Sequence, residues 1–403
     1  MKKILIFISL ISVLLTISSC SSITTPNLVI SKLFDATSSK DNVIEIYNAS
    51  ENEVDLEDVE IRIYNNGSTT KGGDHSIELT GLLGSNEYYV VSGNNTQNMD
   101  IKEKTDFEFE GNLPFNGNDV IELYFKNVLF EQLGYFGFDI DYCLDVTLIR
   151  LGHKEEFVSS KEFYQFDFIT YIPDLFQQLK NDEHEIKTLE ELYAGPKLEN
   201  RFKTLDYVDP ENENLGLGGA ALTEVTSVAD GDTASFKRMN GYPGGSLRYF
   251  YLNTPEVKGN YVDAEAWGYV ASKYNKEYLL NNPQNKEIYV QSIPGNALKE
   301  GYGRNLALVW INGHLSQFLI VSEGLTEDVG SQYNTYDRIL TYLNVPYLTF
   351  MRFAQERALI NGWGTKGFPA NENGEMSPDW NYDLNKNTTE NPVWSPNLDL
   401  PWA

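Results

Sequence analysis

Residues 225–256, VTSVADGDTASFKRMNGYPGGSLRYFYLNTPE, decide how the second half of this chain folds. A strand-like start leads into the turn Asp230–Thr233, and a second strand and a hairpin at Tyr242–Gly245 follow. The apolar and aromatic run 247–252 then ends in Asn-Thr-Pro-Glu. Alternating β-branched and aromatic residues bounded by Gly, Pro and Asn are typical of strands and hairpins. Two acids in the turn and Glu256 at the strand end can converge on one metal ion, and such hard oxygen ligands suit Ca²⁺ or Mg²⁺.

Three short motifs in and after this stretch resemble the signatures of the staphylococcal nuclease (thermonuclease) family. That family has a DGDT turn, an arginine-containing strand ending in DTPE, and a later YGR. Here the motifs read DGDT at 230–233, Arg248 followed by NTPE at 253–256, and YGR at 302–304. One such motif is weak evidence, but three in order are specific. The resemblance covers roughly residues 220–368 and implies an OB-fold barrel of five strands with an inserted helix, whose face commonly binds oligonucleotides.

The resemblance also implies roles for individual residues. A Ca²⁺ ion is bound by Asp232, Asn253 and the carbonyl oxygen of Thr254. The catalytic set is Arg248, Glu256 and Arg304. Glu256 orients or deprotonates the attacking water, and the guanidinium forks clamp the phosphate oxygens two at a time. Each residue taken alone has a structural explanation, as a turn former or an ion-paired arginine, so only the full set indicates a nuclease.

Asn253 departs from the family pattern, which usually has aspartate at this position. Asparagine keeps an oxygen ligand but removes a negative charge, and calcium affinity depends on the number of charged ligands. We therefore expect weaker metal binding, which does not require loss of activity.

The bulk composition limits the partners of this chain. At 403 residues it is long enough for two or three domains, and its net charge is −27. That charge argues against a large nonspecific DNA-binding surface. Across 221–368, however, 13 Lys and Arg stand against 14 Asp and Glu, so the acid excess lies elsewhere and a local basic cleft remains compatible. The four histidines are scattered along the chain, which argues against zinc-dependent hydrolysis.

The N-terminus is typical of an exported protein. Two lysines precede an apolar run of about 14 residues, which ends in Ser-Ser-Cys at Cys20 and is too short to span a membrane comfortably. Residues 1–20 resemble a bacterial lipoprotein signal, which implies lipid on the thiol of Cys20 and anchoring at the extracellular face of the cell membrane. A plain secretory signal is the alternative. Residues 21–26 form a short tether.

Residues 27–150 read as one short strand after another, separated by turn residues. Seven strand-like segments are LVISKLF, NVIEIYN, VEIRIYN, HSIELT, EYYVVSG, FEFEG and DVIELYF. This spacing predicts a β-sandwich. The sequence around VIEIYNAS and YYVVSG is similar to that of the lamin-tail domain, an immunoglobulin-like sandwich. The ligand of this domain is unknown. Its acidic cluster at 51–60 could bind Ca²⁺, although a solvated loop is the simpler interpretation.

The remaining segments are less distinctive. Residues 151–220 mix apolar and charged residues at helical spacing and end in a Gly-rich stretch, so we expect a partly helical connector. Residues 369–403, rich in Asn, Pro and Trp, are expected to form an irregular tail.

The chain is therefore expected to combine an all-β immunoglobulin-like sandwich with an α+β OB-fold barrel over residues 221–368. Our first hypothesis is a surface-anchored, Ca²⁺-dependent nuclease that hydrolyses extracellular DNA or RNA. A second is a catalytically weak or inactive surface lipoprotein that binds nucleic acid or a host ligand. A third, a structural envelope protein, rests on the lamin-tail resemblance alone.

Overall fold

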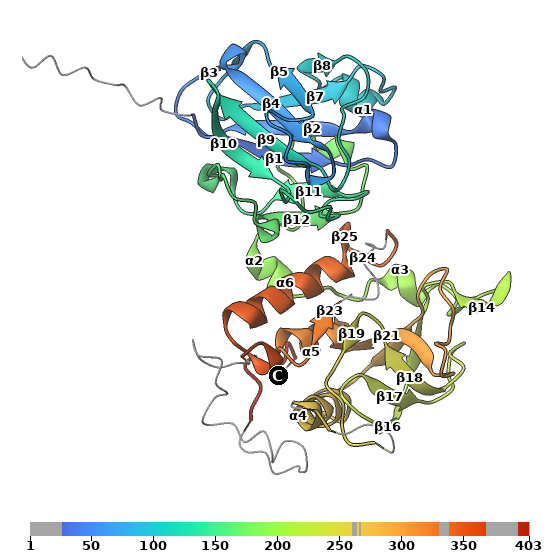
Figure 1. Ribbon diagram of the computed structural model, residues 1–403. Coiled ribbons are helices and arrows are strands. Elements are labelled where there is room, and N and C mark those ends of the chain that lie inside the picture. The colour runs from blue at the N-terminus through green and yellow to red at the C-terminus, as the bar shows by residue number, and fades with distance from the viewer. Residues whose placement is uncertain (1–25, 260–263, 266, 330–337, 368–393, 403) are drawn as a thin grey trace, which may run out of the picture.

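The computed structural model describes residues 26–259, 264–265, 267–329, 338–367 and 394–402 (Figure 1). A β-sandwich occupies the upper half of the view, and a small barrel with helices beside it occupies the lower half. The predicted export signal, the lipidation site Cys20 and most of the tether lie outside the described residues. Within the described residues, no helix is both long enough and apolar enough to cross a membrane.

The sandwich is made of two antiparallel-dominated sheets. The first has the strand order β12-β11-β1-β2-β7-β8 and the second β10-β9-β4-β5. The strands of the first sheet are β1 (Leu28–Phe34), β2 (Val43–Asn48), β7 (Tyr88–Gly93), β8 (Phe107–Phe109), β11 (Thr147–Arg150) and β12 (Phe168–Tyr171). The second sheet holds β4 (Val59–Tyr64), β5 (His75–Glu78), β9 (Val120–Phe125) and β10 (Val128–Leu133). A short pair, β3 (Val54–Asp55) and β6 (Leu82–Leu83), closes one end. All seven strand-like segments of the sequence contain a strand.

The first sheet is buried on both faces. Ile44 and Ile46 of β2 belong to the core between the two sheets, whereas Val43 of the same strand belongs to a second core. This second core also contains Ile169 of β12 and continues through the connector into the barrel half, as far as Trp310. Because successive side chains of a strand point to opposite faces, a strand covered on both sides reads as a continuous apolar run. This second core is therefore shared by the sandwich half and the barrel half.

The connector is partly helical, but one of its segments is a strand. It contains two short α-helices, α2 (Leu189–Tyr193) and α3 (Asn200–Lys203), and the hairpin of β13 (Val208–Asp209) and β14 (Asn212–Gly216). The run Phe168–Tyr171, which we expected to be helical, instead pairs with β11 as β12. A short apolar run of this kind cannot be assigned from its spacing alone, and here pairing to an existing sheet edge decides it. The sheet thus continues past residue 150.

The barrel is built from five strand positions. Its strand order is β15-β20-β21-β18-β17-β16. The strands are β15 (Ala220–Thr223), β16 (Val225–Val228), β17 (Thr233–Phe236), β18 (Gly245–Tyr249), β20 (Ile288–Gln291) and β21 (Asn305–Ile311). Only Glu224 separates β15 from β16, which lie at opposite ends of this order. The two ends of the sheet therefore meet in one bent strand, and the barrel closes; β18 and β21 are its parallel pair. The OB-fold assignment stays a prediction.

Helices and short strands surround the barrel. The helices are α4 (Gly268–Lys273), which continues as a π-helix over Tyr274–Leu280, α5 (Ser316–Ser322) and α6 (Tyr347–Ile360). A further short helix, α1 (Met99–Lys102), lies in the sandwich half. The short strands are β19 (Leu252–Asn253), β22 (His314–Leu315), β23 (Asp328–Val329), β24 (Thr341–Tyr342) and β25 (Val345–Pro346). Single 3₁₀ turns lie at Ser39–Asp41, Leu56–Asp58, Asn65–Gly67, Lys154–Glu156, Gln165–Asp167, Phe176–Gln178 and Gly364–Gly367.

Helix α6 lies between the two halves (Figure 1). At one end the ring of Tyr347 meets the buried indole of Trp310 edge-on, with 5.2 Å between the ring centroids. Further along, Phe353 packs against Phe166 at 5.1 Å, and the hydroxyl of Thr349 donates to the carbonyl of Thr170 at 3.0 Å. The helix therefore fixes the barrel half to the edge of the first sandwich sheet.

The last described segment, 394–402, crosses the barrel half without forming a helix or strand. Trp394 packs edge-on against Tyr274 at 5.8 Å. The backbone N–H groups of Asn397 and Leu398 donate to the carboxylate of Glu323 at 2.7 and 3.0 Å. At the end, the ring of Trp402 packs against that of His314 at a tilt, with 5.6 Å between the ring centroids. The predicted irregular tail is thus tied to the fold over these residues; 368–393 lie outside the described residues.

His314 makes stability depend on pH. Its ring accepts a hydrogen bond from the ammonium of Lys197 at 2.8 Å, and burial together with that positive charge lowers the pKa of His314 to about 4. A folded pKa below the unfolded one gives stability that is present above about pH 6.5 and is lost as the pH falls toward 4. Because the ring is partly exposed, we expect a loss of about 1–2 kcal/mol.

Urea denaturation at pH 7.0 and 4.5 checks this expectation. The His314→Gln variant cannot take up the proton, so its free energy of unfolding should fall less between the two pH values than that of the wild type. His184, whose pKa burial also lowers to about 4, remains in both proteins and cancels from the comparison. Equal losses in the two proteins contradict the assignment.

Candidate active site

The carboxylate of Asp232 lies at the centre of the candidate site. Its side chain is only 1 % exposed and sits in the turn between β16 and β17. One oxygen accepts from the backbone N–H and the hydroxyl of Thr254, at 2.8 and 3.2 Å, and the other accepts from the hydroxyl of Thr233 at 3.1 Å and from Arg248. Burial raises the pKa of Asp232 to about 7, although Arg248 acts in the opposite direction. The turn and the Asn-Thr-Pro-Glu segment are therefore joined at this carboxylate.

Gly231 allows the turn to pass close to its neighbours. A Cβ atom at this position would lie 2.5 Å from the hydroxyl oxygen of Thr254 and 2.8 Å from the Cβ of Ala271. Any side chain would thus push the turn away from Thr254 and from helix α4. Asp230 shapes the same turn, because its carboxylate accepts the backbone N–H of Asp232 at 3.1 Å.

Arg248 joins the two halves of the predicted metal site. It lies on β18 directly opposite Thr233, and its guanidinium donates to both Asp232 and the side-chain oxygen of Asn253. Between β18 and β19 the chain bends at Tyr251, whose φ of 74° is uncommon for a residue with a side chain. This bend brings Asn253 back beside the strand that carries Arg248.

Arg304 approaches the same place from the start of β21. Its guanidinium donates to the hydroxyl of Thr233 at 3.2 Å and to the carboxylate of Glu300 at 2.6 Å. The hydrogen bond that Arg304 donates to Glu300 raises the pKa of Arg304. The hydroxyl of Thr233 therefore links the Asp232 carboxylate with the second arginine.

Glu256 lies within the electrostatic reach of both arginines. Burial is the main cause that raises the pKa of its carboxyl, and Asp230 adds to the rise, whereas Arg248 and Arg304 lower it. Its backbone N–H donates to the carboxylate of Glu265 at 2.8 Å. A half-buried carboxylate of raised pKa near two guanidinium groups is a suitable general base.

The structure joins five of the six residues that the sequence singled out, and Glu256 lies within reach of the charges of Arg248 and Arg304. Hydrogen bonds join Asp232, Arg248, Asn253 and Thr254 directly and Arg304 through Thr233. Sequence reasoning missed the acids around this group, namely Glu265, Glu300 and Glu327. The last accepts from the amide of Asn253 at 3.2 Å. Only Glu300 has a local signal, its position four residues before Arg304.

The predicted metal ligands match Ca²⁺ in donor type more than in charge. The side-chain oxygens of Asp232 and Asn253 converge on one guanidinium, so they also face one point where a cation could lie. Carboxylate, amide and carbonyl oxygens suit a hard cation. However, the described residues contain no group of three or more His, Cys, Asp or Glu placed to hold a metal ion. The donor types therefore suit a hard cation, while in this structure the guanidinium of Arg248 binds both side-chain oxygens.

Comparison with known families concerns the sandwich. The model of the Lamin Tail Domain family matches residues 21–137. Residues 21–137 are a lamin tail domain. This agrees with the resemblance seen in its strands, although the match ends before β11 and β12, which complete the first sheet. No curated protein matches the chain.

Two buried ion pairs lie in or beside the lamin tail domain. Lys32 on β1 meets Glu45 on β2 at 2.5 Å, and both side chains are almost fully buried. Glu131 on β10, 1 % exposed, meets Arg150 on β11, which lies just after the matched residues. The Nε of Arg150 also donates to the carbonyl of Ile30 at 3.1 Å. Each pair joins two strands, and each charge faces its counter-charge. We therefore interpret these pairs as structural and not as part of a catalytic centre.

Proposed function

We propose that the chain is a nuclease that hydrolyses phosphodiester bonds of DNA or RNA at the Asp232–Arg248–Arg304 cluster. The observation that carries the proposal is the connection of three separate motifs through the Asp232 carboxylate and the Thr233 hydroxyl. Sequence spacing alone does not require these contacts. The closed barrel with its parallel β18–β21 pair also supports the predicted OB-fold.

Each residue has a chemical role in this proposal. Arg248 and Arg304 bind the non-bridging oxygens of the phosphate, where negative charge grows during attack by water. Glu256 takes a proton from that water. Asp232, Asn253 and the carbonyl of Thr254 would hold Ca²⁺, which supplies additional positive charge beside the phosphate when bound. For this, Arg248 must leave at least one of its two present partners.

Cleavage of single-stranded DNA by residues 21–403 tests the proposal. We expect hydrolysis with millimolar Ca²⁺ and none after addition of a chelator. Absence of cutting with any divalent ion would reject it.

We further propose that the protein is held at the extracellular face of the cell membrane by lipid on Cys20. The Ser-Ser-Cys ending of the apolar N-terminal run supports this. Full-length protein produced in a bacterium should partition into the detergent phase, and a Cys20→Ser protein should not. Equal partitioning of the two would reject the anchor.

A second candidate function is a module that binds nucleic acid without cutting it. One specific observation favours it, namely that Arg248 is bonded to both side-chain metal ligands while Asn253 carries no charge. Retained DNA binding without cleavage in the assay above would support this alternative.

Replacing Asn253 by aspartate distinguishes a weak metal site from an absent one. The added carboxylate should lower the Ca²⁺ concentration needed for half-maximal cleavage by about tenfold, roughly 1.4 kcal/mol. Without metal, the repulsion between the new carboxylate and Glu327 is opposed by a new ion pair with Arg248, so stability should change little. Calcium titration of the cleavage rate measures the first effect.

The control for this variant is Asn296→Asp, which adds the same charge on an exposed loop outside the cluster. It should leave the calcium dependence unchanged. If Asn253→Asp and Asn296→Asp behave alike, Asn253 is not a ligand.

A further inference from the structure

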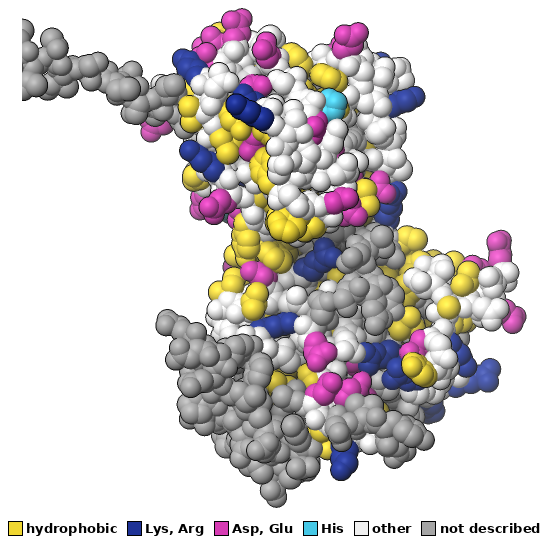
Figure 2. All heavy atoms as spheres, in the orientation of Figure 1, with side chains coloured by type: hydrophobic (Ala, Val, Ile, Leu, Met, Phe, Trp, Pro, Cys, Tyr) yellow, Lys and Arg dark blue, Asp and Glu magenta, His cyan; other side chains and the backbone are white. Residues whose placement is uncertain are grey.

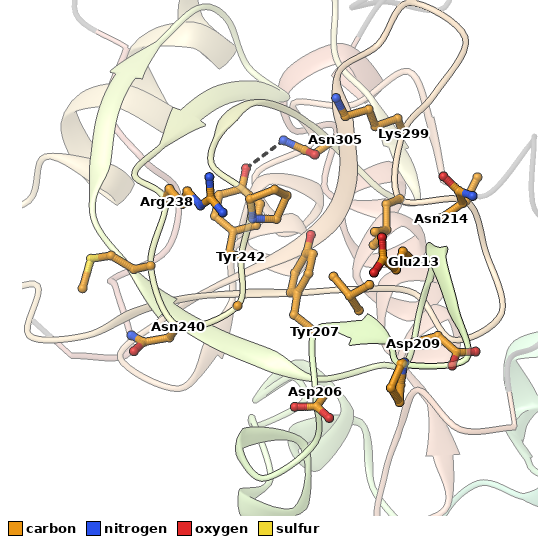
Figure 3. Close-up of a pocket in the computed structure, with 17 residues that line it drawn as sticks. Asp206, Tyr207, Asp209, Glu213, Asn214, Arg238, Asn240, Tyr242, Lys299 and Asn305 are labelled. Atoms are coloured by element: carbon orange, nitrogen blue, oxygen red, sulfur yellow. Dashed lines mark hydrogen bonds between the residues drawn. The ribbon is translucent and has the colours of Figure 1, made fainter.

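A large cleft opens between the connector and the barrel (Figure 3). Its volume is about 1130 Å³, and its walls come from the β13–β14 hairpin, the β17–β18 hairpin, residues 297–299 and Asn305. Asn305, the residue next to Arg304, lies in its wall. Asn305 follows Arg304 in the sequence, but Arg304 itself does not line the cleft, which belongs in part to the connector.

Two tyrosines form the interior of the cleft. The rings of Tyr207 and Tyr242 lie 5.2 Å apart at a steep angle, and both are buried. The hydroxyl of Tyr207, a side chain only 3 % exposed, has no hydrogen-bond partner within the described part of the chain. Figure 3 shows it pointing into the cleft, toward the side where Asn305 lies. Burial raises the pKa of Tyr207 well above its usual value, so the hydroxyl is neutral and can donate or accept.

The side-chain oxygen of Asn305 is a second buried polar atom without a hydrogen-bond partner in the described part of the chain. Its amide nitrogen donates to the carbonyls of Gly244 and Ser246 at 3.0 and 3.2 Å and to the hydroxyl of Tyr242 at 3.2 Å. These acceptors fix which end of the amide is nitrogen. The oxygen, on a side chain 3 % exposed, is a buried acceptor without a partner among the described groups. Because buried polar atoms are nearly always hydrogen-bonded, the two atoms indicate a bound molecule with matching donors and acceptors.

Charge is divided across the cleft. In Figure 3, Arg238 and Lys299 lie on the same side of Tyr207 as Asn305, Asp206 and Asp209 lie on the opposite side, and Glu213 lies between Lys299 and Asp209. A phosphate chain can therefore pass along one rim only. Aromatic walls with a positive rim are the common means of holding single-stranded nucleic acid.

We propose that this cleft binds an unpaired nucleobase of a nucleic-acid strand, with the base against Tyr207 and Tyr242 and the neighbouring phosphates along Arg238 and Lys299. The Asn305 oxygen accepts from a ring N–H or exocyclic amino group of the base, and the Tyr207 hydroxyl completes its hydrogen bonds. A base in a duplex cannot reach buried atoms of this kind, so the site selects single strands. This inference rests on the proposed function, because a nucleic-acid strand is the ligand in both. It adds a binding contact away from the phosphodiester bond that is cut.

Binding of two fluorescent hexamers in the presence of a chelator tests the proposal. One is hexathymidylate, and the other has the same phosphates but no bases. Hexathymidylate should bind at least tenfold more tightly than the abasic strand. Tyr207→Phe removes only a hydroxyl without a protein partner, so the variant should fold normally. It should bind hexathymidylate about five- to twentyfold more weakly and the abasic strand unchanged.

The rim has its own matched pair of variants. Arg238→Gln should weaken binding of both hexamers and reduce the salt dependence. Lys237→Gln removes the adjacent charge, which pairs with Glu224 outside the cleft, and should bind as the wild type does. Equal binding of the two hexamers, or an unchanged affinity in Tyr207→Phe, overturns the proposal.

These outcomes are separate from the test of the nuclease. Calcium-dependent cutting together with unchanged binding in Tyr207→Phe would reject the cleft alone. The predicted binding pattern without any cutting would reject the nuclease alone.

Discussion

Hydrolysis should fall by about 10²–10⁴-fold when Glu256 is replaced by glutamine. Glutamine keeps the size of the side chain but cannot accept a proton from water. The backbone N–H of residue 256, which donates to Glu265, is unaffected, so the local fold should persist. Cleavage rates and DNA affinity should be measured on the same preparation, and the affinity should change little because no contact to the phosphate is removed.

The control for this variant is Glu224→Gln. Glu224 is a surface acid of the same barrel, with 62 % of its side chain exposed, and this side chain pairs with Lys237. Its loss should leave cleavage within twofold of the wild type. Full activity in Glu256→Gln would remove Glu256 from the mechanism and leave the nuclease proposal without a base.

The second large effect concerns stability. Arg150→Met should lower the free energy of unfolding by about 3–5 kcal/mol, because it leaves the buried carboxylate of Glu131 without its cation. Burial already raises the pKa of Glu131 to about 7 with Arg150 present, so the carboxyl should take up a proton in the variant. Urea denaturation at pH 7 measures the loss, which should shrink at lower pH.

Two further variants test whether the buried charge is the cause. The double variant Arg150→Met with Glu131→Gln should recover a large part of the loss, since no unpaired charge remains. Lys126→Met breaks an ion pair with Asp58 whose side chains are 48 % and 38 % exposed, and should cost less than about 0.5 kcal/mol. A double variant no more stable than Arg150→Met alone would show that lost packing is responsible.

The local sequence was sufficient to predict those elements that depend on alternation, turn residues and short motifs. Alternation and turn residues located all seven sandwich segments, and the three motifs located residues that the fold joins through Asp232 and Thr233. It failed where distant partners decide. Phe168–Tyr171 is a strand because β11 offers an unpaired edge. Glu265 and Glu327 have no motif, and Tyr207 enters the cleft from a connector in which no function could be recognised.

The completion of the sandwich by later strands limits how this chain can be inherited in parts. A genetic exchange that carried residues 21–137 alone would leave β1 without its neighbour β11, and an open central edge invites association with other chains. Strand β12, in turn, packs on α6, which belongs to the barrel half. A fragment that keeps the partners of β1 and β11 must therefore reach at least Tyr171, and without the barrel half it would expose the side of β12 that α6 covers.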